Sequence, residues 1–105
     1  MTSDNVKFFK ALGEETRLLI VRYLLSGERC VCEFAPLTGK DQTTVSRHLR
    51  ILVEGGVLDS RKVSRFIYYR IKNEEVMNML KSFGVEAIEK PTSGIYSNGR
   101  CSNEG

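Results

Sequence analysis

Two cysteines separated by one residue, Cys30 and Cys32, are the side chains of this sequence best suited to bind a soft ion. Thiolates are soft ligands and suit thiophilic ions such as trivalent arsenic or antimony, cadmium, lead and zinc. Residues i and i+2 point about 200° apart on a regular α-helix, at about 100° per residue. We therefore expect both sulfurs to share one ion only if that turn unwinds, which would couple binding to local conformation. From these residues alone a structural role is favoured over ion binding, because small cysteine side chains are commonly buried.

A second group of polar residues lies in the segment 41–54, where Val45, Leu49 and Leu52 recur at helical spacing. Side chains of Gln, Arg, Ser and Thr can contact base edges or phosphates in DNA. The outer face of this predicted helix carries Gln42, Thr43, Thr44, Ser46, Arg47, His48 and Arg50. A structural role or a phosphate contact suits His48 better than metal ligation, since the chain has a single histidine.

Positive charge is concentrated around this helix. The chain as a whole has a net charge of only +3, but the stretch from Lys40 to Lys72 holds eight basic and three acidic residues. The three basic residues Arg61, Lys62 and Arg65 surround a predicted hairpin turn, from which they would reach phosphates or the minor groove. A solvated helix face is the alternative for each feature alone, but their combination and order indicate DNA binding.

The elements that position these residues are mainly helical. Apolar spacing and stop signals predict helices from Asn5 to Leu12 and from Glu14 to Leu25, separated by Gly13. The segment 30–37 is expected to begin extended and to become helical only near Pro36.

Asp41 is the expected N-cap of the next helix, with its carboxylate accepting from the backbone N–H of Thr43 or Thr44, and Gly55-Gly56 ends that helix. Alternation from Val57 to Ile71 predicts a β-hairpin that turns near Val63-Ser64. A last helix is expected at 73–83, capped by Asn73.

These elements predict a mainly α fold with a β-hairpin, a winged helix-turn-helix. The expected domain covers residues 1–88, followed by a flexible C-terminal tail at 89–105 that is rich in small and polar residues. Excess apolar residues on the first two helices suggest that a partner chain covers them.

Length and composition are those of one globular domain, with 105 residues, 41% hydrophobic and 28% charged. No run of about 18 apolar residues is present to span a membrane, and the N-terminus lacks signal-peptide regions. The expected compartment is the cytoplasm, where thiols stay reduced. An enzyme is not expected, because the sequence has no Cys-x-x-Cys motif, paired carboxylates or phosphate-binding glycine loop.

The run DQTTVSRHLRIL from Asp41 to Leu52 resembles the recognition helix of the ArsR/SmtB family of metal-sensing repressors. The segment ERCVCEF, from Glu28 to Phe34, resembles the ELCVCDL metal box of the arsenical and cadmium/lead branches of that family. The resemblance covers about residues 8–80. It implies a homodimer, formed by the first and last helices, that binds an imperfect palindrome in double-stranded operator DNA.

The resemblance also implies that Cys30 and Cys32 bind an inducer, with As(III) or Sb(III) expected, other thiophilic ions as alternatives and no cofactor required for DNA binding. Many arsenical repressors carry a third cysteine three residues after the second, where this chain has Ala35. Cys101 is then the candidate third ligand, from its own chain or its partner, and its alternative is an idle thiol. The cadmium/lead branch uses N-terminal cysteines and the zinc, nickel and cobalt branches use His on the last helix, and this chain has neither.

The expected function is therefore a metalloid-responsive repressor, which arsenite or antimonite releases from DNA. A thiol redox switch on the same scaffold is an alternative, in which Cys30, Cys32 or Cys101 forms a disulfide. A cadmium- or lead-responsive repressor is the other.

Overall fold

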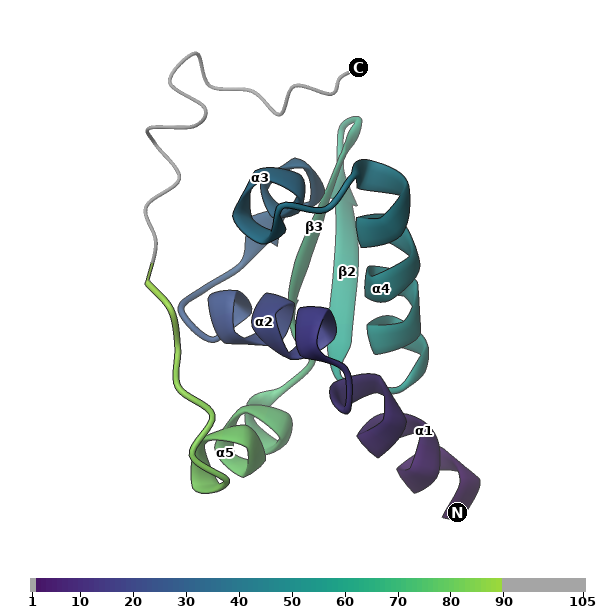
Figure 1. Ribbon diagram of the computed structural model, residues 1–105, viewed down its shortest axis with the longest axis vertical. Helices are drawn as coiled ribbons and strands as arrows, with labels where there is room; N and C mark the ends of the chain where they lie inside the picture. The colour runs from purple at the N-terminus through teal and green to yellow at the C-terminus, as the bar shows by residue number, and fades with distance from the viewer. Residues whose placement is uncertain (1, 90–105) are drawn as a thin grey trace.

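The computed structural model describes residues 2–89, which form five α-helices, a short 3-10 helix and a three-stranded antiparallel sheet (Figure 1). The elements follow in the order α1 (Thr2–Leu12), α2 (Glu15–Leu24), β1 (Arg29–Cys30), η1 (Val31–Glu33), α3 (Phe34–Thr38), α4 (Gln42–Glu54), β2 (Leu58–Val63), β3 (Phe66–Ile71) and α5 (Glu74–Ser82). The predicted helices, the hairpin and their order are confirmed.

The first two helices separate at Gly13, as predicted. The side chain of Glu14 caps α2, because its Oε1 accepts a hydrogen bond of 2.8 Å from the backbone N–H of Arg17. Burial alone would raise the pKa of Glu14, but this hydrogen bond and the charge of Arg17 lower it below its ordinary value.

The helix-turn-helix consists of α3 and α4. The segment before α3 begins extended, as predicted, but helical structure starts at Val31, earlier than the expected position near Pro36. Gly39 ends α3 with a φ of 76°, a left-handed conformation that favours glycine. Asp41 is the N-cap residue of α4, but its carboxylate makes no capping hydrogen bond to the backbone, which corrects the predicted cap contact.

The hairpin β2–β3 turns at Ser64-Arg65 and pairs Leu58 with Ile71 at its base. The sequence did not predict its third strand. Residues Arg29 and Cys30 pair with Tyr69 and Tyr68, which places β1 on the outer edge of β3. The start of the helix-turn-helix is thereby attached to the hairpin β2–β3, which is the wing of this fold.

Helix α5 begins where Asn73 accepts a hydrogen bond of 2.9 Å from the backbone N–H of Val76, as predicted. The chain then returns to α2, where the Ile88 amide donates to the Arg22 carbonyl at 3.0 Å. Apart from Glu89, the predicted tail at 89–105 lies outside the described residues.

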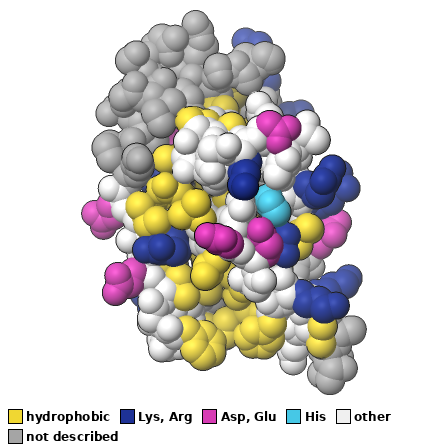
Figure 2. Space-filling view, in the orientation of Figure 1, with side chains coloured by type: hydrophobic (Ala, Val, Ile, Leu, Met, Phe, Trp, Pro, Cys, Tyr) yellow, Lys and Arg dark blue, Asp and Glu magenta, His cyan; other side chains and the backbone are white. Residues whose placement is uncertain are grey.

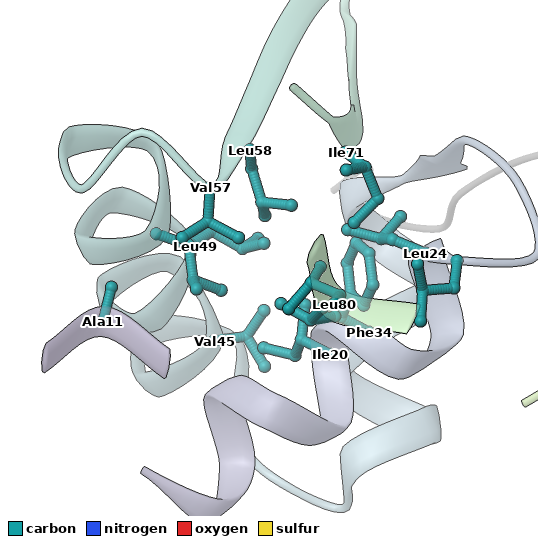
Figure 3. Packing of buried hydrophobic residues seen from close by; sticks show 13 residues of the cluster. Ala11, Ile20, Leu24, Phe34, Val45, Leu49, Val57, Leu58, Ile71 and Leu80 are labelled. Carbon is teal, nitrogen blue, oxygen red and sulfur yellow. The ribbon is translucent and has the colours of Figure 1, made fainter. Parts of the chain in front are cut away.

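The hydrophobic core lies between α2, α3, α4 and the base of the hairpin (Figure 3). Val45, Leu49 and Leu52 are fully buried, which confirms the predicted inner face of α4. They pack with side chains from the other elements, among them Ile20, Leu24, Phe34, Leu58, Ile71 and Leu80. This packing fixes the orientation of α4, so its opposite face is held toward solvent.

Two helices keep apolar residues on the surface. Val6 and Phe9 of α1 are 50% and 55% exposed, and Phe83 at the end of α5 is 70% exposed. Hydrophobic side chains also gather in the lower part of Figure 2, toward α1 and α5. Among residues 2–89, no helix is long and apolar enough to cross a membrane.

Helix α1 meets the end of α4 at a glycine. A Cβ atom at Gly55 would lie 2.9 Å from the carbonyl oxygen of Lys7 and 3.0 Å from the Ala11 Cβ. Both distances are too short for a larger residue unless α1 shifts. Gly55 therefore permits close contact between α1 and α4.

Candidate functional site

The outer face of α4 presents most of the polar residues that the sequence singled out. Gln42, Thr43, Ser46, Arg47 and Arg50 are exposed, and Thr44 is half-buried at the first turn. The pKa of Asp41 is lowered, chiefly by a hydrogen bond from the Thr44 side chain. This face can offer hydrogen-bond donors and acceptors to the major groove of a duplex.

His48 differs from its neighbours on α4. Its side chain is only 15% exposed, and its Nδ1 lies 3.1 Å from Nη1 of Arg17 and 3.8 Å from Oε1 of Glu14. A guanidinium can only donate, so Nδ1 accepts and a neutral ring carries its proton on Nε2. Figure 2 shows this histidine in cyan between acidic and basic side chains. The structure thus places His48 at the junction of α4 with α2.

The three predicted wing residues, Arg61, Lys62 and Arg65, are all exposed on the hairpin. The guanidinium of Arg65 lies over the Phe66 ring, 5.9 Å from its centroid. Arg61 makes two hydrogen bonds to the carboxylate of Glu28, with Nε–Oε2 and Nη2–Oε1 distances of 2.8 and 2.9 Å. One of the three wing cations is therefore engaged by an acidic residue of the same chain.

The two cysteines lie together at the entrance to the helix-turn-helix. Cys30 ends β1 with extended backbone angles, and Cys32 lies in the 3-10 helix η1. Their Sγ atoms are 3.1 Å apart. Because Cys30 is extended, as predicted for the start of this segment, the unwinding that a regular α-helix would need is not required before both sulfurs share one ion. The extended residue before η1 already brings the two sulfurs together.

A buried ion pair holds this turn. The Glu33 carboxylate accepts from the backbone N–H of Cys30 through Oε2 and from Nη1 of Arg29 through Oε1, both at 3.0 Å. Arg29 and Glu33 are 6% and 8% exposed, and Nε of Arg29 also donates to the Tyr23 carbonyl at 3.3 Å. These bonds satisfy buried polar groups and fix the backbone on which Cys30 lies.

Apolar side chains surround the sulfurs. Cys30 and Cys32 are 3% and 7% exposed and pack with Val31 and with Phe66 and Tyr68 of β3. No group of three or more His, Cys, Asp or Glu side chains that could hold a metal ion occurs within residues 2–89. The candidate third ligand, Cys101, lies outside the described residues.

Sequence reasoning missed four residues of this region. Arg29 and Glu33 have i,i+4 spacing, which is the one local signal that could have indicated their ion pair. Glu28 and Tyr68 gave no such signal, because their contacts with Arg61 depend on the pairing of β1 and β2 with β3.

Comparison with known proteins identifies the scaffold. Residues 14–60 match the family model described as "Bacterial regulatory protein, arsR family". The chain is 41% identical over 75 residues to the cadmium resistance transcriptional regulatory protein CadC of Listeria innocua, covering 70% of this chain and 63% of that one. It is 42% identical over 67 residues to the arsenical resistance operon repressor of Escherichia coli, covering 63% and 57%. The chain thus spans less than two thirds of the length of each of these two relatives.

A solved structure agrees in fold. The homodimeric winged helix-turn-helix DNA-binding domain of a possible ArsR-family regulator from Mycobacterium bovis superposes with a TM-score of 0.76 at 34% identity. The match covers 80% of this chain and 78% of that one. The predicted winged helix-turn-helix is confirmed, and the matched relatives are transcriptional regulators rather than enzymes.

Proposed function

The chain belongs to the arsR family of bacterial regulatory proteins, and we propose that it is a repressor released from operator DNA by trivalent arsenic or antimony. The observation that carries this proposal is the 3.1 Å separation of the Cys30 and Cys32 sulfurs at the entrance to the helix-turn-helix. The names of two relatives, an arsenical repressor and a cadmium regulator, support an inducer that binds thiols.

The chemistry of the sulfur pair suits a metalloid, because thiolates are soft ligands that bind thiophilic ions. The two sulfurs already lie 3.1 Å apart, so both can reach one ion from this turn. A third ligand would come from Cys101 of either chain or from solvent.

DNA binding is assigned to α4 and the wing. We infer that Gln42, Thr43, Thr44, Ser46, Arg47 and Arg50 face the major groove and that Arg61, Lys62 and Arg65 reach the flanking backbone or minor groove. His48, also expected at this surface, makes its contacts with α2, so we propose that it holds α4 in place. In this proposal DNA binding requires no cofactor.

The active species is proposed to be a homodimer that binds an imperfect palindrome. Its interface would cover the exposed apolar side chains of α1 and α5, Val6, Phe9 and Phe83. The homodimeric neighbour from Mycobacterium bovis supports this arrangement. Two recognition helices about one turn of DNA apart, roughly 34 Å, would then enter successive major grooves.

The test is a DNA-release assay. An operator is first selected by the protein from a random-sequence duplex pool, labelled with fluorescein and bound under a phosphine reductant, since dithiols would chelate arsenic. Sodium arsenite, antimonyl tartrate, cadmium and zinc are then titrated while anisotropy is recorded. Release by arsenite and antimonite at lower concentrations than by cadmium or zinc supports the proposal, and release by cadmium alone refutes the metalloid assignment.

The same sulfur distance suits a redox switch, which is the second candidate function. Hydrogen peroxide would accept two electrons from the two thiols, giving one disulfide and two water molecules. A disulfide needs its sulfurs about 2.05 Å apart, so only a short movement is required. Release by peroxide without reductant, together with no response to any ion, would favour this alternative.

A further inference from the structure

One row of side chains connects the cysteine pair with the basic wing. Cys30 of β1 pairs with Tyr68 of β3, and Tyr68 pairs with Arg61 of β2. Side chains of directly paired residues in antiparallel strands lie on the same face of the sheet. Cys30, Tyr68 and Arg61 therefore lie side by side across the three strands.

The members of this row are in contact. The Tyr68 ring packs against Cys30 and Cys32 on one side. The guanidinium of Arg61 lies over the same ring, 5.7 Å from its centroid. A movement of the sulfurs toward a common ligand would thus meet the ring that supports Arg61.

Glu28 connects the same two places through the backbone. It lies two residues before Cys30 and binds both Nε and Nη2 of Arg61. The Arg61 side chain is 55% exposed and that of Glu28 is 28% exposed, and ion pairs at such exposure are weak. A DNA phosphate can therefore replace Glu28 as the partner of Arg61.

We propose that Glu28 is a positioning residue that competes with DNA phosphate for Arg61, and that a ligand on Cys30 and Cys32 shifts this competition toward Glu28 through Tyr68. The second half rests on the proposed function, whereas the first half concerns the protein without any inducer. The two cysteines do not lie on a regular α-helix, so inducer binding cannot act by unwinding one. In this proposal inducer binding changes DNA affinity through the wing instead.

The competition is tested with Glu28→Gln on a labelled mixed-sequence duplex, without inducer, over a series of salt concentrations. In the wild type Arg61 is shared between Glu28 and phosphate, so its full release adds up to one phosphate contact and log K against log salt steepens by up to about 0.9. We expect affinity to rise about three- to tenfold at low salt. The matched control is Asp59→Asn, which also removes one carboxylate that pairs with an arginine of the hairpin, but frees Arg70 instead of Arg61. Equal changes in slope for both variants, or an undiminished effect of Glu28→Gln in an Arg61→Ala background, would overturn the competition.

The connection through Tyr68 is tested by the fold-change in operator affinity that sodium arsenite causes. Tyr68→Leu should bring the arsenite-induced fold-change close to one, whatever its affinity for the operator without arsenite. Tyr68→Phe keeps the ring and should restore the wild-type response. A wild-type response in Tyr68→Leu overturns this connection. If arsenite does not release the wild-type protein from DNA, both the proposed inducer and the connection through Tyr68 are refuted. The salt dependence of DNA binding by Glu28→Gln still tests the competition between Glu28 and phosphate for Arg61.

Discussion

The guanidinium of Arg17 and the imidazole of His48 join α2 to the middle of α4, with Nη1 and Nδ1 3.1 Å apart. Arg17 also donates from Nε to the Ala11 carbonyl at 2.7 Å, so one side chain contacts both α1 and α4. The position of α4 thus depends on a polar contact as well as on its buried stripe.

His48→Leu should therefore lower the free energy of unfolding by about 1–3 kcal/mol, because it leaves a half-buried guanidinium donor without its acceptor. Urea denaturation measures this change. In the Arg17→Met background the same substitution should cost less, since the partner is already removed. Ser46→Ala, on the exposed face of the same helix, should change stability by less than about 0.5 kcal/mol. If His48→Leu lowered the free energy of unfolding equally in both backgrounds, the contact between Arg17 and His48 would not contribute to stability.

Arg47→Ala should weaken binding to the selected operator by about 1–3 kcal/mol, with a smaller loss on mixed-sequence DNA, if Arg47 reads a base. Anisotropy titrations on both duplexes give the two values. Lys81→Ala, which removes the same charge from α5, is the control and should leave the ratio unchanged. Equal losses on both duplexes would make Arg47 a phosphate contact only.

Cys32→Ser should leave operator affinity unchanged and abolish release by arsenite, because one oxygen replaces one of two converging soft ligands. The anisotropy assay under a phosphine reductant measures both quantities. Cys101→Ser, tested in parallel, tests the third ligand. A weaker response of this variant to arsenite would identify Cys101 as that ligand. Release that persists in Cys32→Ser would refute the assignment of the thiol pair.

Phe9→Glu should convert the proposed dimer to monomer, because it places a charge on the exposed apolar face of α1. Sedimentation velocity at several protein concentrations measures the change. Ile67→Glu is the matched control, since Ile67 is also an exposed apolar residue, at 36%, but lies on the wing. Dissociation by both variants, or by neither, would place the interface elsewhere.

Stability at acidic pH should depend on Glu14. Its pKa is lowered in the folded protein, so the stabilisation by its charged form is complete above about pH 4.5 and is lost as pH falls through the lowered value. Glu14→Gln should reduce the free energy of unfolding by about 1 kcal/mol at pH 7, the usual value of an N-cap, and by progressively less as pH falls through the lowered pKa of Glu14. Urea denaturation across this range tests it. Glu15→Gln, next to it and exposed, should give a small difference that does not vary in this way.

Local patterns predicted most of the fold because burial of α4 and pairing of the hairpin follow a simple periodicity. Val45, Leu49 and Leu52 recur at helical spacing and are fully buried. The caps of α2 and α5 also follow from residues within three positions of each helix start.

The thiol site was less predictable because its geometry depends on distant residues. Cys30 is extended since it pairs with Tyr68, 38 positions later, and that pairing places its sulfur beside Cys32. His48 likewise looked like part of the polar face of α4, and only the packing of α2 against α4 shows its contact with Arg17. Spacing along one element cannot indicate either contact.

The close contact at Gly55 has a consequence for the spacing between operator half-sites that a dimer would accept. Because α1 rests directly on the end of α4, the helix proposed at the subunit interface and the helix proposed in the groove would rotate together. A small change of angle between two α1 helices would then become a larger change in the distance between the two α4 helices. Operator half-sites would be tolerated at one spacing and rejected when one base pair is added or removed between them.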